Sequence, residues 1–286
     1  LVQDARRHGV AVLGPSVNAS FLDAGVQRAP DVQGAQEYQQ GRPDPLPSRQ
    51  TVPLDVDPHL AVRIGLSSVR GLGRAARRIV QARESGLFTS QVDLAARAHL
   101  SASDMEKLAM AGALDCLGVG RRQGAWSAGA LAAPTLREGE WQPFLPGTEV
   151  GTRVPDLPTL TDAEQMRADV EATGLTPGDH PFSYLRATLP PGVARAADLG
   201  AHLDGRIVDV AGLVTHRQRP STEDETGFVN VSASVGTWTK FRRVGLESDA
   251  LLVRGTLEWG DGAINVRAFR LTPVHLPIQV RSRDFR

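Results

Sequence analysis

Apolar residues recur at helical spacing through much of the segment 60–131, and this pattern predicts a compact helical unit. One helical run covers residues 74–84. The apolar residues that fall on one helical face at this first helix and just before it are Leu72, Ala75, Ala76, Ile79 and Val80. Ser90 is placed to begin a second helix, and Ser103 with Glu106 has the spacing of a capping box for a third. These signals predict short helices packed around one core.

Helix signals also occur at the end of that unit and on either side of it. Residues 121–131 form the run RRQGAWSAGAL, and residues 161–173 begin with Thr161 and Glu164 spaced as another capping box. At the start of the chain, a helical phrase that ends at Gly9 precedes the apolar run VAVL, which is typical of a short strand.

From residue 205 onwards the period changes from helical to alternating, as in β-strands. Four strands are expected, at 206–217, 227–233, 250–259 and 263–274. The phrase VGTWTKFRRVG between the second and third predicts a helix, which gives the element order of an OB-fold with one of its five strands missing. Because one strand is missing, we expect an open or distorted sheet.

These patterns define an α+β multidomain fold class with six parts. Two proline-rich segments with few apolar residues flank the helical unit. The two similar halves of that unit predict a tandem helix-hairpin-helix, and the β part predicts a C-terminal OB-fold-like unit that is incomplete. The parts are the end of an α/β or helical unit at 1–27, a proline-rich linker or insertion at 28–59, the tandem helix-hairpin-helix at 60–131, a linker at 132–160, a helical connector at 161–204 and the OB-fold-like domain at 205–286.

The phrase VRGLG at 69–73 has the pattern of a hairpin between two helices. Its two glycines allow a tight turn with positive φ, and the next helix presents N-terminal amides that form an anion site. Six arginines and one acid lie between Val62 and Ser90, although the chain has zero net charge. The residues predicted to bind the DNA backbone are Arg70, Gly71, Leu72, Gly73, Arg74 and Arg77. The alternative is a C-cap glycine, a short loop and a solvated basic helix.

Weaker signals occur elsewhere in the chain. The second half of the helical unit contains MAGALD, with a single glycine, and is expected to be structural. In the β part, charge at a strand end and an indole beside a turn suggest single-strand contacts. The residues concerned are His216, Arg217, Arg219 and Trp259. Trp238 and Phe241 could also stack on bases, but their spacing favours the core face of a helix.

The composition excludes several classes of function. The one cysteine, Cys116, rules out an intrachain disulfide and a multi-cysteine metal site, and its apolar neighbours predict a buried thiol. The seven histidines show no metal-ligand spacing, and no nucleotide-binding or serine-hydrolase motif occurs. We therefore expect neither a catalytic residue nor a metal or other cofactor in this chain. No signal peptide or long apolar run is present, which predicts a cytoplasmic location.

The order of several phrases resembles the C-terminal part of a family C DNA polymerase, the class of the bacterial DNA polymerase III alpha subunit. The phrases are LVQDARRHGVAVLGPSVNAS, VRIGLSSVRGLGRAARRIVQAR, LFTSQVDLAARAHLSASDMEKLAMAGALDCLG, VDVAGLVTHRQRP and DETGFVNV. THRQRP and the terminal RSRDFR are similar to the error-prone, damage-induced branch of the family, the ImuC type. The chain departs from the family in two places. It has a proline-rich insertion at 28–58, and between HRQRP and EDETG, where the family has a strand, only Ser221 and Thr222 remain.

This resemblance implies a part of an enzyme for translesion DNA synthesis, a DNA-directed DNA polymerase. In the family, the opening phrase ends the fingers region, the tandem helix-hairpin-helix binds duplex, and the OB-fold lies near the single-stranded template. The palm with its metal-binding aspartates lies upstream, so Mg2+ and nucleotidyl transfer belong to the longer protein. The expected partners are DNA, bound without sequence preference, and other translesion or sliding-clamp proteins, with the bacterial nucleoid as the place of action.

Two alternatives remain open from the residues themselves. One is a non-enzymatic DNA-repair binding module with the same helical and OB parts. The other is a degenerate protein-interaction scaffold, which a lost OB strand and a lack of DNA affinity would indicate. Palm aspartates encoded upstream of Leu1 would decide for the polymerase.

Overall fold

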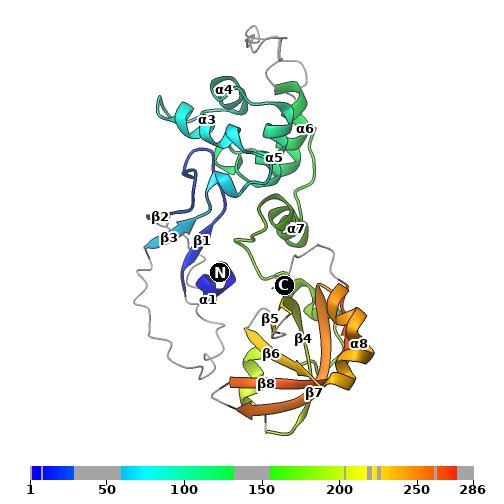
Figure 1. The fold of residues 1–286 in the computed structure, drawn as a ribbon. Helices are drawn as coiled ribbons and strands as arrows, with labels where there is room; N and C mark the ends of the chain where they lie inside the picture. The colour runs from blue at the N-terminus through cyan, green and yellow to red at the C-terminus, as the bar shows by residue number, and fades with distance from the viewer. Residues whose placement is uncertain are drawn as a thin grey trace. The chain divides into compact units, whose positions relative to one another are not determined.

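The computed structural model describes most of the chain, and the described residues form two compact units (Figure 1). They are residues 2–7, 9–28, 59–131, 155–202, 204–217, 221–223, 227–260 and 263–275. The first unit comprises those up to Pro177, and the second those from Gly178 onwards. The proline-rich segments predicted at 28–59 and 132–160 lie largely outside the described ranges. No helix within these ranges is long and apolar enough to cross a membrane.

The first unit begins with a helix and a small mixed sheet. These elements are α1 (Val2–Arg7), β1 (Ala11–Leu13), β2 (Gly25–Arg28) and β3 (Leu60–Arg63). Strand β3 lies in the middle, parallel to β1 and antiparallel to β2. The predicted helix and strand on either side of Gly9 are confirmed, and this glycine makes the turn between them at φ +84°.

Five α-helices and the 3-10 turn Leu66–Ser68 follow in the described part of the first unit. The α-helices are α3 (Arg74–Arg83), α4 (Gln91–Arg97), α5 (Ala102–Met110), α6 (Arg121–Leu131) and α7 (Asp162–Thr173). Helix α4 has the predicted cap, because the Ser90 hydroxyl accepts from the Asp93 amide. Helix α7 has the predicted capping box of Thr161 and Glu164 and ends at Gly174, whose φ of +76° is the left-handed C-cap conformation.

The capping box predicted for α5 is wrong by two residues. The sequence places a serine three residues before an acid twice here, once at Ser101 and Asp104 and once at Ser103 and Glu106. The structure uses the first pair, in which each side chain accepts from the other residue's backbone amide. Ser103 and Glu106 are exposed on the helix surface.

The apolar residues around the α5 cap explain this choice. Leu100 precedes the cap and Met105 occupies the fourth helical position, and both are completely buried. This is the arrangement of a hydrophobic staple, which fixes the entry angle of the chain into a helix. Ile79 of α3 and Leu94 of α4 are equally buried in the same core. Starting the helix at Ser103 would remove the staple from the core.

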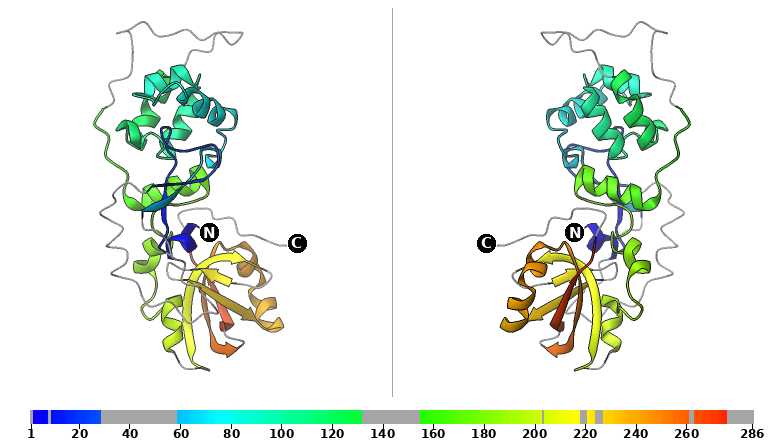
Figure 2. Two further views of the ribbon diagram at one scale, coloured as in Figure 1. Left: turned by 90° about the vertical axis from the view of Figure 1, so that its left-hand side faces the viewer. Right: turned by 90° about the vertical axis from the view of Figure 1, so that its right-hand side faces the viewer.

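The second unit is built around a barrel of five strands, which two further views show from its sides (Figure 2). Its elements are β4 (Ile207–His216), β5 (Ser221–Glu223), β6 (Phe228–Ala233), α8 (Val235–Glu247), β7 (Ala250–Gly260) and β8 (Ala263–Pro273). The barrel closes in the order β4-β5-β6-β8-β7. Strands β6 and β8 are parallel, and the other neighbours are antiparallel. The α+β class and the OB-like unit are therefore confirmed.

The predicted loss of one barrel strand is wrong. Strand β5 has only three residues, but it pairs with β4 on one side and with β6 on the other. Thr222, for example, lies opposite Val214 of β4 and Val229 of β6. A register shift in β4 between Val214 and His216 accommodates the short strand. The shortened sequence therefore keeps enough backbone to close the barrel, and the expected open sheet does not form.

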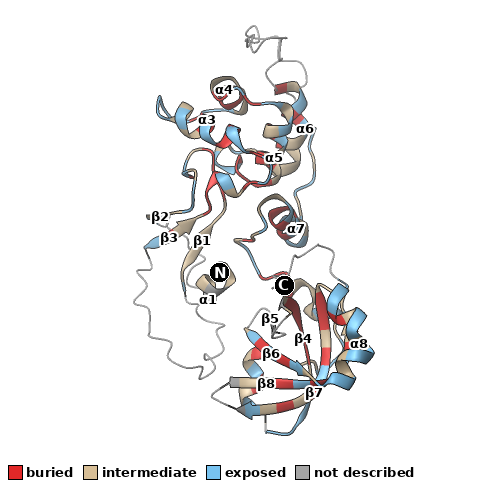
Figure 3. Cartoon of the chain, in the orientation of Figure 1, coloured by how far each residue is buried: buried red, intermediate tan, exposed pale blue. Residues whose placement is uncertain are grey.

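The segment predicted as one connector, 161–204, divides between the two units. Helix α7 belongs to the first unit, whereas the residues after Gly178 pack against the barrel. Phe182 is fully buried beside Leu213 and Ala250, and Leu199 joins the barrel interior. Figure 3 shows the buried residues in each unit by colour.

The expectation of a buried cysteine is wrong. Cys116 lies in a short 3-10 turn, Asp115–Leu117, and its side chain is exposed. The apolar residues before it, Ala113 and Leu114, turn into the core of the first unit. Because a tight turn directs successive side chains differently, Ala113 and Leu114 are buried while Cys116 is exposed, with its thiol 3.8 Å from the Ala113 carbonyl that it donates to.

Candidate nucleic-acid interface

The predicted hairpin at 69–73 is a tight exposed turn that leads into α3. Val69 and Leu72 are buried and anchor it in the core, whereas Gly71 and Gly73 are exposed. Gly71 has φ +72°, and Gly73 has φ +47° with ψ −117°. Residues with a Cβ adopt such conformations only at a cost, so both positions favour glycine.

The turn leaves backbone donors available at the start of α3. Gly73 is the N-cap residue and supplies no side-chain cap. Within the described ranges, the amides of Gly71, Gly73 and Arg74 have no hydrogen-bond acceptor. Free amides at a helix N-terminus coincide with the positive end of the helix dipole. This arrangement suits a phosphate group.

Two arginines add positive charge beside these amides. Arg74 and Arg77 lie in the first turn of α3, and both are exposed. Neither has a carboxylate or carbonyl partner among the residues that the structure describes. Both side chains are therefore available to an anion that approaches the turn.

The other four arginines between Val62 and Ser90 bind carbonyl groups of the protein. They are Arg63, Arg70, Arg78 and Arg83. Arg78 donates to the carbonyls of Ala98 and His99 at the end of α4, at 2.9 and 3.1 Å. Burial lowers the pKa of Arg63 and of Arg83. The basic composition of this segment is thus mostly structural.

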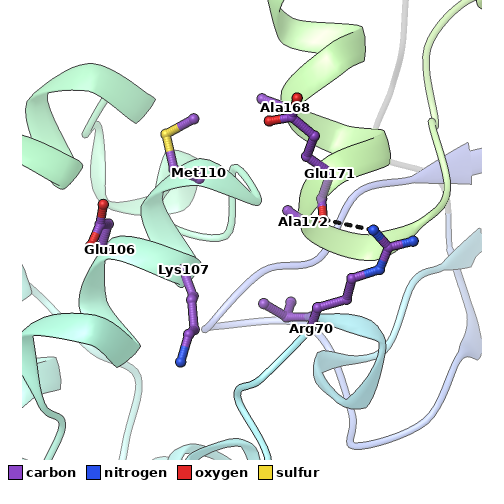
Figure 4. A pocket seen from close by; sticks show the side chains of 8 residues that line it. Arg70, Glu106, Lys107, Met110, Ala168, Glu171 and Ala172 are labelled. Carbon is purple, nitrogen blue, oxygen red and sulfur yellow. Dashed lines mark hydrogen bonds between the residues drawn. The ribbon is translucent and has the colours of Figure 1, made fainter. Parts of the chain in front are cut away.

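Arg70, which was predicted to bind DNA, is hydrogen-bonded to the end of α7. Its backbone amide donates to the carbonyl of Ala172 at 2.8 Å, and its Nη1 donates to the carbonyl of Glu171 at 3.0 Å (Figure 4). On the other side of the hairpin, Lys107 Nζ of α5 donates to the Gly71 carbonyl at 3.0 Å. Lys107 was not predicted, because its partner lies 36 residues away. A cavity of about 240 Å³ lies between these elements, with Glu106 among its lining residues.

The second half of the helical module contains a similar turn that is covered. Gly112 has φ +72°, the same as Gly71, but it is buried. Arg121 of α6 donates to the Met110 carbonyl at 3.0 Å and forms an ion pair of 2.7 Å with Asp169 of α7. Burial raises the pKa of the Asp169 carboxyl, and the charge of Arg121 opposes that rise. This turn presents no free surface to a ligand, which supports the structural role expected for it.

The single-strand candidates of the barrel are distributed over different environments. His216 ends β4, and its side chain lies outside the described residues, as does all of Arg219. Arg217 donates to the carbonyls of Gly245 and Ser248, at 3.2 and 3.0 Å, and so caps the end of α8. Trp259 is 45% exposed near the β7–β8 turn.

Phe241 of α8 has the core packing role that its spacing favours, whereas Trp238 packs on its own helix. Phe241 and Val244 pack against the barrel core. The Trp238 ring covers Gly245, where an added Cβ would lie 2.8 Å from the ring. These side chains therefore support the helix, and Trp259 is the better candidate for base stacking.

The exposed glycine turn between short helices defines the class of this unit as a helix-hairpin-helix module. A family model described as the helix-hairpin-helix motif matches residues 9–124. Along its whole length, the chain is similar to proteins named error-prone DNA polymerase. It is 42% identical to the one from Mycolicibacterium paratuberculosis, 41% to the one from Nocardia farcinica and 39% to the one from Cutibacterium acnes.

The chain spans about a quarter of the length of these curated relatives, 24% of the first two and 27% of the third. Among solved structures, the hypothetical protein ygiW from E. coli aligns with 30% of this chain and 94% of its own. The sequence identity there is 15% and the TM-score is 0.25, a likeness too slight to bear on fold or function.

Proposed function

We propose that this chain is the DNA-binding region of an error-prone, translesion-type DNA-directed DNA polymerase. The observation that carries the proposal is the exposed turn of Gly71 and Gly73, whose free amides open helix α3. The similarity of the whole chain to error-prone DNA polymerases supports it. The helix-hairpin-helix would hold duplex DNA behind the primer end.

The proposed contacts use the DNA backbone alone. A phosphate would accept hydrogen bonds from the amides of Gly71 and Gly73, and Arg74 and Arg77 would add charge. Arg70 and Leu72 complete the predicted set, and Leu72 acts as the buried anchor of the turn. Phosphate contacts position a protein without reading sequence, which suits an enzyme that must move along any template.

The chemistry of nucleotidyl transfer would take place outside this chain. Mg2+ would serve the longer enzyme, where two such ions assist phosphoryl transfer. The described ranges contain no group of three acidic, histidine or cysteine side chains that could hold a metal. Purified residues 1–286 with primer, template, nucleotides and Mg2+ should give no extension. Extension that persists through repurification would contradict this assignment.

The barrel is a weaker proposed contact for the single-stranded template. Trp259 would stack on a base, and His216 and Arg219 would approach the backbone. Arg217 already binds two carbonyls, so its contribution would be the smallest. We further propose sliding-clamp or other translesion proteins as partners, and a cytoplasmic enzyme that acts at the nucleoid.

Duplex affinity tests the proposal directly. Anisotropy of a fluorescein-labelled duplex of arbitrary sequence should show binding by the 286-residue chain that weakens as salt rises, by a power of about 0.9 per phosphate contact. Unlabelled duplexes of other sequences should compete equally. Absence of binding at low salt would exclude the proposed role.

A further inference from the structure

We propose that α7 is a clamp that holds the DNA-binding turn in shape, and that Arg70 is a positioning residue rather than a phosphate ligand. This inference deepens the proposed function and depends on it for its DNA readout. It is drawn from the contacts on both sides of the turn.

The end of α7 receives Arg70 at two successive carbonyls. The backbone amide donates to Ala172 at 2.8 Å, and the guanidinium donates to Glu171 at 3.0 Å. The last carbonyls of a helix have no acceptor role within the helix and carry its negative end. A guanidinium there is favoured by charge as well as by hydrogen bonding. Arg70 is therefore engaged without any DNA.

The residue that ends α7 is adapted to this contact. Gly174 adopts φ +76°, and a Cβ built there would lie 2.8 Å from Nη2 of Arg70. Glycine thus allows both the left-handed C-cap and the approach of the guanidinium. Gly118 has a similar φ of +71°, but nothing lies within 4 Å of its Cβ position. The two glycines therefore have nearly the same φ, but only Gly174 lies against a neighbouring side chain.

Helix α7 is itself fixed to α6 at two further points. Asp169 forms the buried ion pair of 2.7 Å with Arg121, and Glu164 pairs with Arg122 at 3.0 Å. These two ion pairs hold α7 against α6. On the opposite side, Lys107 holds the Gly71 carbonyl at 3.0 Å.

Together these contacts orient the turn. The Arg70 amide and the Gly71 carbonyl are both directed to protein partners, while the amides of Gly71, Gly73 and Arg74 stay free. A preformed arrangement of donors binds an anion with less loss of conformational entropy. Positive charge for the phosphate then comes from Arg74 and Arg77.

The experiment compares three variants of the full 286-residue chain, Arg70→Ala, Gly174→Ala and the control Gly118→Ala. Duplex affinity is measured by anisotropy over a salt series, and amide hydrogen exchange at Arg70 and Leu72 is measured without DNA. Arg70→Ala and Gly174→Ala should each weaken binding by roughly fivefold, the factor expected for the loss of one ordinary hydrogen bond. Both should leave the salt slope unchanged and speed exchange at the turn.

Three results define the outcome. Gly118→Ala should leave affinity and exchange at the turn unchanged, which controls for strain at a positive φ. The double variant Arg70→Ala with Gly174→Ala should be no weaker than either single variant, because both break one contact. A salt slope that falls by about 0.9 in Arg70→Ala would overturn the proposal, since it marks a lost phosphate contact.

Unchanged affinity and exchange in both clamp variants would overturn the proposal equally. If the unsubstituted chain binds no duplex, the proposed function fails by itself. The exchange rates then still decide whether α7 holds the turn.

Discussion

The two glycine turns of the helical module have the same backbone conformation and opposite surroundings. Gly71 and Gly112 both have φ +72°. The first turn is exposed and opens a helix with free amides, whereas the second is buried beneath Arg121 and its ion pair with Asp169. A positive φ at glycine therefore gives the shape of a hairpin but does not make it a binding site. What makes the difference is the covering of the turn by other elements.

The largest expected effect concerns the cover of the second turn. Asp169→Ala should lower the free energy of unfolding by about 3 kcal/mol, because it leaves the buried Arg121 without its charged partner. Urea unfolding followed by circular dichroism measures this. Glu247→Ala is the control, since its pair with Arg243 is exposed and should contribute little. Equal stability of the two variants would mean that the buried ion pair does not hold Arg121 over the second turn.

The next effect comes from placing the same substitution, glycine to valine, in each of the two turns. Gly71→Val should reduce duplex affinity by about tenfold or more, because a β-branched residue is strained at this φ and its Cβ would lie 3.2 Å from the Lys107 side chain. Gly112→Val should reduce stability instead, since its Cβ would approach Arg121 to 2.9 Å in a buried site. Anisotropy and urea unfolding on both variants check this. Loss of duplex affinity by a well-folded Gly112→Val would break the comparison.

A smaller effect distinguishes free from engaged arginines near the first turn. Arg77→Ala should weaken duplex binding severalfold and lower the salt slope by about 0.9, because one phosphate contact is lost. Arg78→Ala should leave the slope unchanged, since Arg78 is bound to the carbonyls of Ala98 and His99. The same slope in the unsubstituted chain and in Arg77→Ala would remove Arg77 from the interface.

The smallest effect is a pH dependence at the start of α7. Hydrogen bonds from the Thr161 amide and hydroxyl lower the pKa of Glu164 from its ordinary value of 4.5. A carboxyl whose pKa is lower in the folded state stabilises the fold above its unfolded pKa, and this contribution is lost as pH falls through the folded pKa. In urea unfolding, the unsubstituted chain should thus have a higher free energy of unfolding than Glu164→Gln at neutral pH, and this difference should disappear in acid. A difference that grows in acid would mean that the pKa of Glu164 is raised rather than lowered by folding.

Local signals predicted much of the helical module. The apolar face with Ile79, the caps at Ser90 and Thr161 and the stop at Gly174 depend on neighbours within one or two turns, so the sequence contains them. The α5 cap was misplaced because two serine–acid pairs fit the same rule. Only the burial of Leu100 and Met105 selects between them, and that burial depends on the assembled core.

Long-range contacts account for the features that could not be predicted. Strand β5 is too short to show an alternating pattern, and its pairing exists because β4 and β6 lie on either side of it. The assignment of Arg70 to DNA rested on its position beside two glycines. Its carbonyl partner in α7 lies 101 residues away, which no local pattern reveals.

The exposed Cys116 has a practical consequence. It is the one cysteine of the sequence and follows the covered turn, on the same compact unit as the exposed one. A maleimide dye should therefore attach at a single site without any engineered cysteine or background labelling. Energy transfer from that dye to an acceptor at a chosen phosphate would then measure where the duplex lies on this unit, molecule by molecule.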